Sequence, residues 1–170
     1  IVSTLAPEGS HSLQPADTLL LTATITGLKA EEKELVLNGT TEKRKREKQI
    51  ALWTHNLVLE TPDTILNQLF AFSKIRACES IFETKGGPMH GPGGESYYAA
   101  IWANDQAEYI NPFFPFTGYD YGNESAINAY NHFARYMNPE WKPIPSSVIA
   151  EGTDIWNGAG DRGDAAMIAY

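Results

Sequence analysis

The first third of the chain carries short apolar runs rich in β-branched residues. They span residues 18–26, 34–37, 50–53 and 56–59. Gly27 ends the first run and Asn38-Gly39, a strong turn dipeptide, ends the second; this pattern indicates β-strands. The two later runs predict a third strand or an extended linker, after a polar stretch at 40–48. We therefore interpret residues 1–60 as a β segment and linker, the end of a β-sandwich-type domain.

The spacing of apolar residues changes at Thr61. Thr61-Pro62-Asp63 is typical of a helix start, with a capping hydroxyl, a proline at the first position and an acid in the first turn. From Ile65 to Phe82 apolar side chains recur at spacings of three and four, which predicts a helix of roughly 20 residues. Its apolar face is wide, so we expect burial on more than one side.

Three further helices are expected in residues 97–110, in residues 123–137 and from about Asp161 onward. Long loops join them at residues 85–96, 112–122 and 138–160, and loops of this length commonly carry function. The second of these helices should turn one face inward, comprising Ile127, Tyr130, Phe133, Ala134 and Met137. The expected fold class is α+β, with a β segment at 1–60 and a helical domain at 61–170.

Charge and composition exclude several classes of function. The net charge is −8 and the pI about 4.9, so nucleic acid is not an expected partner. The basic run at 43–46 is balanced by Glu42 and Glu47, and we interpret it as a solvated linker. No stretch approaches the ~20 apolar residues of a membrane span. Cys78 is the single cysteine and lies in an apolar helical pattern, which favours a packing role.

Residues 84–118 combine glycines, prolines, aromatic side chains and two carboxylates, Asp105 and Glu108. Glycine lets the backbone approach a ligand, aromatic rings offer flat apolar faces, and carboxylates accept hydrogen bonds from hydroxyls. This combination favours a sugar ligand. A phosphate loop is disfavoured, because two prolines remove amide donors and neither glycine fingerprint is matched. A serine nucleophile is disfavoured because the chain has no Gly-x-Ser-x-Gly motif.

A metal site has little support in the sequence. His90, Asp105, Glu108 and His132 lack a paired spacing such as His-x-x-x-His. We interpret His132 as a surface or hydrogen-bonded helix histidine. A structural calcium ion stays open as an alternative without the spacing of an EF-hand, and no other cofactor is expected. Its candidate ligands are Asp154, Asn157, Asp161 and Asp164.

Asp105 and Glu108 are three residues apart, which on one helix turns both carboxylates the same way. Glycosidases need two carboxyl groups on either side of the scissile bond, ~5–9.5 Å apart according to mechanism. At most one of the two can therefore be catalytic. The other would hold sugar hydroxyls, and a partly exposed acidic face is the alternative without a function.

The succession Pro92-Gly93-Gly94, Tyr97-Tyr98, Trp102-Ala103-Asn104-Asp105 resembles the first inter-helix site of six-hairpin (α/α)6 glycosidases. It is similar to motifs of glucoamylases and trehalases. Asn104 stands where glucoamylases carry an arginine, and Ala103 and Asn104 separate Trp102 from Asp105, unlike the trehalase pattern. The resemblance covers about residues 61–170, the first part of a toroid, and a β-sandwich often precedes such toroids.

The resemblance implies that Asp105 holds the terminal (−1) sugar, with Trp102 and Tyr98 shaping its pocket. The stretch Trp156-Asn-Gly-Ala-Gly-Asp-Arg-Gly-Asp164 resembles the next inward loop. It implies that Trp156, Arg162 and Asp164 face the same cavity, with His90 and Glu108 nearby. The general acid and base would come from later hairpins, beyond Tyr170. Within the chain, Glu108 and Asp164 are the candidates for catalysis.

We therefore expect a piece of a longer glycoside hydrolase, inverting in mechanism and inactive as 170 residues alone. Its partner would be a carbohydrate, and helix faces exposed by truncation would favour self-association. The parent would be secreted or periplasmic in a bacterium. The alternative is a non-catalytic module that binds carbohydrate or protein.

Overall fold

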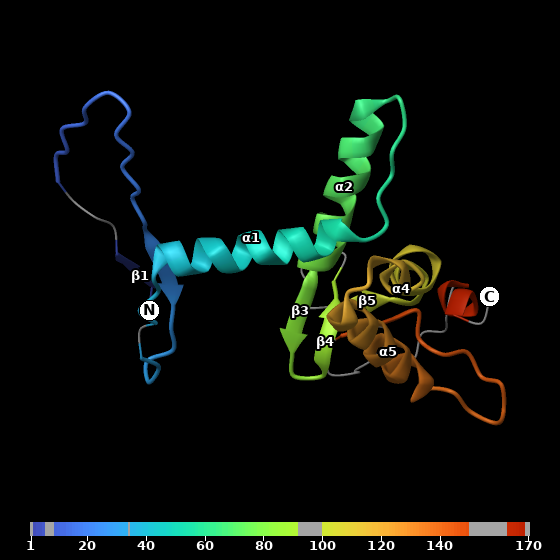
Figure 1. Ribbon diagram of the computed structural model, residues 1–170. Coiled ribbons are helices and arrows are strands. Elements are labelled where there is room, and N and C mark those ends of the chain that lie inside the picture. The colour runs from blue at the N-terminus through green and yellow to red at the C-terminus, as the bar shows by residue number, and fades with distance from the viewer. Residues whose placement is uncertain (1, 6–8, 34, 92–99, 150–162, 169–170) are drawn as a thin grey trace. The chain divides into compact units, whose positions relative to one another are not determined.

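The computed structural model describes residues 2–5, 9–33, 35–91, 100–149 and 163–168. The chain divides into two compact units, Ile1–Gln49 and Ile50–Tyr170, and the division falls inside helix α1 (Gly39–His55). Helices and strands carry the labels of Figure 1. The described residues form helices and three small two-stranded sheets, so the fold is a mixture of α and β as expected.

The first unit contains one antiparallel strand pair, β1 (Val2–Leu5) and β2 (Thr24–Gly27). Val2 lies opposite Gly27 and Leu5 opposite Thr24. The strand predicted at 18–26 is therefore confirmed only at its C-terminal end. Residues 18–23 and 35–37 are not in a strand, so the strands predicted there are wrong. Residues 56–59 are not in a strand either, which leaves the linker, the other conformation predicted for them.

Helix α1 contradicts the linker predicted at 40–48 and the strand predicted at 50–53. Its sequence is dominated by Glu, Lys, Arg, Gln, Ala and Leu, which have high intrinsic helix propensity. The Asn38 side chain accepts a hydrogen bond of 3.0 Å from the Thr41 amide, so Asn38-Gly39 begins a helix instead of a turn. Ion pairs between Lys45 and Glu42 (2.7 Å) and between Lys43 and Glu47 (3.8 Å) follow the helical spacing.

In the second unit, helix α2 (Thr64–Glu79) confirms the helix predicted after Thr61, with a different cap. Asp63 is the N-cap, and its carboxylate accepts hydrogen bonds from the amides of Ile65 (2.9 Å) and Leu66 (3.1 Å). The helix also ends before the predicted Phe82, because the chain turns into a strand at Ile81.

The expectation that α2 is buried on more than one side is wrong. Ile65, Leu69 and Phe72 are 75%, 59% and 57% exposed, whereas the buried residues of the helix are Lys74 and Cys78. Spacings of three and four predict a helix but do not say which of its faces meets a neighbour. Cys78 is a free thiol in the core, as the packing role requires.

Lys74 is the most informative residue of α2, because a charged side chain is 1% exposed. Its ammonium donates hydrogen bonds to the backbone carbonyls of Thr54 (3.0 Å), Asn56 (2.7 Å) and Leu57 (3.0 Å). The last carbonyls of a helix lack partners within the helix and carry partial negative charge. Lys74 therefore caps the C-terminal end of α1.

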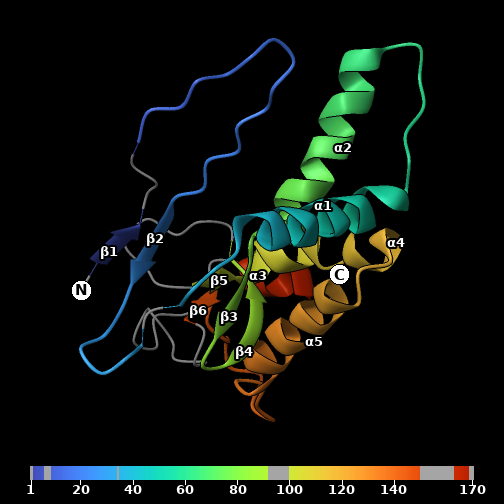
Figure 2. The ribbon, with the colours of Figure 1, turned by 60° about the vertical axis from the view of Figure 1, so that its left-hand side comes forward.

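A β-hairpin occupies the place where sequence predicted the end of a helix and a glycine loop. Strands β3 (Ile81–Thr84) and β4 (Gly87–His90) pair antiparallel, and helix α5 (Asp120–Ala134) lies beside them (Figures 1 and 2). Gly87 has φ 98°, and a Cβ there would lie 2.7 Å from the Asn128 amide nitrogen. Asn128 donates to the carbonyls of Gly86 (2.8 Å) and Pro88 (3.0 Å). Gly87 therefore serves close packing of the hairpin on α5.

The predicted inward face of α5 is largely wrong. Phe133 is 1% exposed, as predicted, but Ile127 and Met137 are 63% and 73% exposed. His132, which was not placed on that face, is 1% exposed. The hairpin presents carbonyl groups to α5, so polar side chains are needed on the buried face. The His132 Nε2 atom lies 3.0 Å from the Gly86 carbonyl oxygen, which confirms a hydrogen-bonded helix histidine.

Of the helix predicted over 97–110, residues 97–99 lie outside the described residues, 100–102 are not helical, and 103–110 are. Strand β5 (Ile101–Trp102) pairs with β6 (Ser147–Val148) and leads into α3 (Ala103–Asp105) and a π-helical turn, η1 (Gln106–Ile110). Helix α4 (Phe114–Thr117) and the 3₁₀ helix η2 (Asp164–Ile168) complete the described elements. Tertiary strand pairing thus overrides a local helical pattern.

Two apolar clusters hold the second unit together. One surrounds the β5–β6 pair and α5, and its larger side chains are Met89, Ile101, Phe133 and Val148. The other lies where α1, α2, η1 and α4 meet, and its larger side chains are Trp53, Ile110 and Phe114. The segment 103–110 runs from the first cluster to the second, so its backbone is anchored at both ends.

Candidate functional site

Asp105 lies at the last position of α3, where the strand β5 has just ended. The backbone here is held because the Ala103 amide donates to the Ser146 carbonyl (2.9 Å) beside the β5–β6 pair. The Tyr109 hydroxyl, one turn later, donates a hydrogen bond to the Asp105 carboxylate. The carboxylate is thus positioned by a strand pair behind it and a phenol in front of it.

The surroundings of Asp105 disfavour its charged form. Partial burial is the main cause that raises the pKa of its carboxyl group, followed by the negative charges of Asp164 and then Glu108. Asp164 begins η2, which contacts both α3 and η1. A raised carboxyl pKa produced by burial and like charge is a feature of functional sites as well as of some structural clusters.

The carboxylates near Asp105 come from two different elements. Glu108 follows Asp105 on the same turn and is exposed, whereas Asp164 is supplied by η2. Sequence reasoning named all three residues but placed weight on the pair Asp105 and Glu108. The structure shows Asp164 as the stronger electrostatic neighbour, and this pairing joins segments that the sequence separates widely.

His90 lies at the end of β4 and is 7% exposed. Its ring packs edge-on against Phe114 with centroids 6.1 Å apart, and burial lowers the pKa of its imidazole to about 4. Its carbonyl accepts a hydrogen bond of 3.0 Å from Gln106, the residue after Asp105. The His90 imidazole is therefore neutral, and it is the His90 backbone carbonyl that bonds to η1, through Gln106.

Trp102 is half-buried and lies in β5, opposite Ser147. Tyr98, Trp156 and Arg162 lie outside the described residues, as do the calcium candidates Asp154, Asn157 and Asp161. The described part of the candidate site is therefore Trp102, Asp105, Glu108, Asp164 and His90.

Within the described ranges, no group of three or more His, Cys, Asp or Glu side chains is arranged to hold a metal ion. In the same part of the chain, no helix combines the length and the apolar character that crossing a membrane requires. The Asp105 carboxylate is thus described as a partly buried acid with a phenol partner and two acidic neighbours.

Sequence reasoning missed two features. The first is the hydrogen bond from Tyr109 to Asp105, for which the spacing of four residues is the signal. The second is a cavity of about 440 Å³ at the C-terminal end of α5, lined partly by Trp141 and by Ile168 of η2. Trp141 had a signal too, since it lies between Pro139 and Pro143 in a long loop.

Comparison of the chain with protein-family models, with curated proteins and with solved structures finds no match.

Proposed function

We propose that this chain is part of a glycoside hydrolase and contributes the wall of the active site that holds the terminal sugar. The parent enzyme hydrolyses a glycosidic bond with water, by inversion, and its helical domain is an (α/α)6 toroid. The proposal rests on the geometry around Asp105 together with the resemblance of residues 92–105 to six-hairpin glycosidases.

The observation that carries the proposal is that a second carboxyl group, Asp164, approaches Asp105 from another element. A carboxylate that is partly desolvated binds a sugar hydroxyl more strongly than one in open water, because less solvent competes. Trp102, three residues earlier and half-buried, offers an aromatic surface of the kind that suits the apolar face of a sugar ring.

The three acids have separate roles in this proposal. Asp105 accepts hydrogen bonds from sugar hydroxyls, and Tyr109 keeps its carboxylate oriented. Asp164 and Glu108 raise the pKa of Asp105 and are the acids of this chain that are available for proton transfer. The main general acid and base belong to later parts of the parent chain.

The test is a kinetic comparison of the parent protein with its Asp105→Asn variant on a panel of aryl glycosides. Asparagine has nearly the same shape but cannot offer a charged acceptor. The fall in kcat/KM should therefore correspond to a loss of more than ~2 kcal/mol of transition-state stabilisation. The matched control is Glu124→Gln, an exposed acid on α5, which should leave kcat/KM unchanged.

Unaltered kinetics of Asp105→Asn would remove this residue from the site. The 170-residue chain alone should show no hydrolysis, because the main acid and base are absent. Robust turnover by the chain alone would contradict that assignment of the catalytic groups.

A second candidate function is supported by the exposed apolar side chains of α2. Ile65, Leu69 and Phe72 follow a helical spacing and are more than half exposed, which is typical of a surface that meets another protein. In this case the chain is a non-catalytic interaction module. Sedimentation velocity over a range of concentrations separates the two candidates: self-association that Leu69→Ser abolishes, without any glycosidase activity in the parent, would favour the module.

A further inference from the structure

The cavity at the end of α5 is a separate feature from the Asp105 site. Its volume is about 440 Å³, and its apolar wall includes Tyr130, Phe133, Trp141, Ile144 and Ile168. Small-molecule sites in proteins have volumes of ~300–1,000 Å³ and are lined mainly by apolar and aromatic side chains with few polar groups. Both the size and the lining of this cavity fit that class of site.

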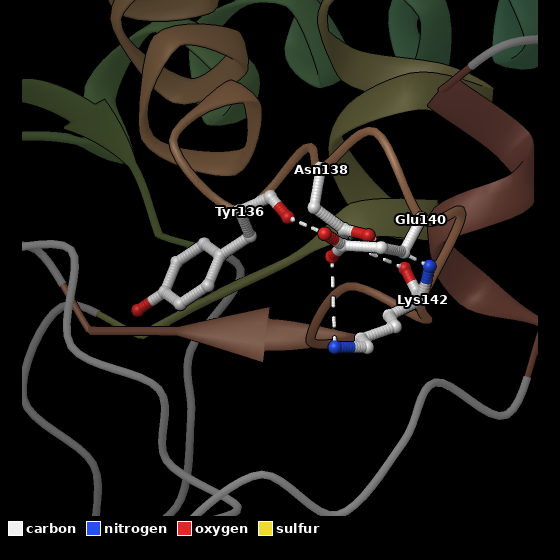
Figure 3. Close-up of polar contacts among 4 residues, drawn as sticks. All are labelled: Tyr136, Asn138, Glu140 and Lys142. Carbon is white, nitrogen blue, oxygen red and sulfur yellow. Dashed lines mark hydrogen bonds and ion pairs between the residues drawn. The ribbon is translucent and has the colours of Figure 1, made fainter.

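The loop that borders the cavity is held by one side chain, Asn138 (Figure 3). Its amide nitrogen donates to the carbonyls of Tyr136 (3.2 Å) and Lys142 (3.1 Å), and its amide oxygen accepts from the Lys142 amide (2.8 Å). Asn138 thereby closes residues 138–142 into a fixed turn, since all three bonds join backbone groups to a single side chain.

Trp141 lies in this turn with a strained backbone conformation. Its φ is 56°, in the left-handed region that residues with a Cβ rarely adopt, and its side chain is 92% exposed. Backbone strain of this kind persists only where the surroundings impose it, and it concentrates at ligand-binding segments. A tryptophan held rigidly at the edge of an apolar cavity is a flat surface on which a ring can stack.

Lys142 is the cation among the described residues that line the cavity. The Lys142 ammonium lies 3.5 Å from the Glu140 carboxylate, and both side chains are largely exposed (72% and 62%; Figure 3). Exposed ion pairs of this kind are weak, so an anionic group of a ligand can replace Glu140 as the partner of Lys142.

We propose that this cavity binds a small aromatic molecule that carries one anionic group, such as an aryl carboxylate or sulfonate. The ring system lies in the apolar cavity against Trp141, and the anionic group pairs with Lys142. The proposal does not depend on the glycosidase function, because none of these residues belongs to the Asp105 site.

Isothermal titration calorimetry with two probes tests the proposal. The first probe is 8-anilinonaphthalene-1-sulfonate, and the second is N-phenyl-1-naphthylamine, its neutral counterpart without the sulfonate. Wild-type protein should bind one equivalent of each. Trp141→Gly should weaken both probes about tenfold, because the stacking surface is lost while glycine accepts the left-handed backbone.

Two charge variants separate the anionic contact from apolar binding. Lys142→Met should weaken the sulfonate probe roughly two- to fivefold, and Glu140→Gln should tighten it by a similar factor. The neutral probe should respond to neither change. A charge dependence of this sign places the sulfonate beside Lys142.

The matched control is Phe72→Ser on α2, which removes an exposed apolar side chain far along the sequence from the cavity. Its affinities for both probes should equal those of the wild type, and circular dichroism melts should confirm that every variant is folded. The proposal is overturned by absence of binding to the wild type, by unchanged affinities in a folded Trp141→Gly variant, or by equal weakening in Phe72→Ser.

Discussion

Lys74 and Asp105 are both ionisable groups that are wholly or partly buried. The surroundings of Lys74 supply hydrogen-bond partners, whereas those of Asp105 supply charges of the same sign. Lys74 is 1% exposed and each of its three ammonium protons has a carbonyl acceptor, from Thr54, Asn56 and Leu57. Asp105 is half-buried, accepts a hydrogen bond from the Tyr109 hydroxyl, and is repelled by its charged neighbours Asp164 and Glu108.

The difference separates a structural charge from a candidate functional one. The cost of burying the Lys74 ammonium is offset by hydrogen bonds to groups that would otherwise lack partners at the end of α1. Burial lowers the pKa of the Lys74 amine, but the three carbonyl groups around it need the ammonium protons as hydrogen-bond donors. Among the described residues one donor is seen on the Asp105 carboxyl, whose pKa is raised, and a carboxylate can accept further hydrogen bonds, so a ligand with hydroxyl groups would improve its surroundings.

The largest expected effect follows from Lys74→Met. Methionine has a similar length but no donors, so three carbonyl groups at the end of α1 lose their partner beside a buried side chain, and the free energy of unfolding should fall by about 3 kcal/mol. Urea denaturation followed by far-ultraviolet circular dichroism measures the change. Lys85→Met, at the exposed hairpin turn, is the control and should shift stability by less than ~0.5 kcal/mol. Equal effects in both variants would show that Lys74 is not a structural cap.

Asp105→Asn should raise the free energy of unfolding, and by less than Lys74→Met lowers it. Because the pKa of Asp105 is raised on folding, the folded state holds more protons than the unfolded state between the unfolded and folded pKa values, and stability falls as pH rises through that window. At pH 7 the substitution should therefore stabilise the protein, by at most about 1 kcal/mol because solvent screens a half-exposed group. Urea midpoints at pH 7 and pH 3 provide the measurement. The gain should vanish at pH 3, and a gain that persists there would contradict the electrostatic explanation.

The smallest effects concern the two neighbours of Asp105. Asp164→Asn and Glu108→Gln should each lower the pKa of the Asp105 carboxyl, with the larger shift in Asp164→Asn. Titration of the Asp105 side-chain carboxyl followed by carbon-13 NMR reports both shifts directly. A larger shift in Glu108→Gln would mean that Glu108, on the same turn, raises the pKa of Asp105 more than Asp164 of η2 does.

The sequence predicted helices best where the pattern was local. The helices predicted after Thr61 and over 123–137 are present as residues 64–79 and 120–134, and Asn111-Pro112 directly follows the helical turn that ends at Ile110. The prediction was wrong at residues 40–53, where helix propensity outweighs a short apolar run. It was also wrong at residues 101–102, because a strand partner distant in the sequence, Ser147–Val148, decides the conformation there.

Burial was harder to predict than helix content. The apolar residues of α2 are largely exposed, while a lysine on the same helix is buried, because the end of α1 offers carbonyl acceptors to Lys74. In α5, His132 and Asn128 replace Ile127 and Met137 on the packed face, because the hairpin turn at Gly86 requires hydrogen-bond donors.

The sequence by itself determined the mixed fold class, the two main helices of the second unit and the presence of acids and aromatic residues around position 105. These features depend on neighbours a few residues away, which a linear pattern contains. Only the tertiary structure decided that Asp164 is the main acidic neighbour of Asp105, that Lys74 caps another helix, and that Asn138 holds Trp141 at the edge of a cavity. Each of these depends on which groups meet across space, and hydrogen bonds and desolvation act through that distance alone.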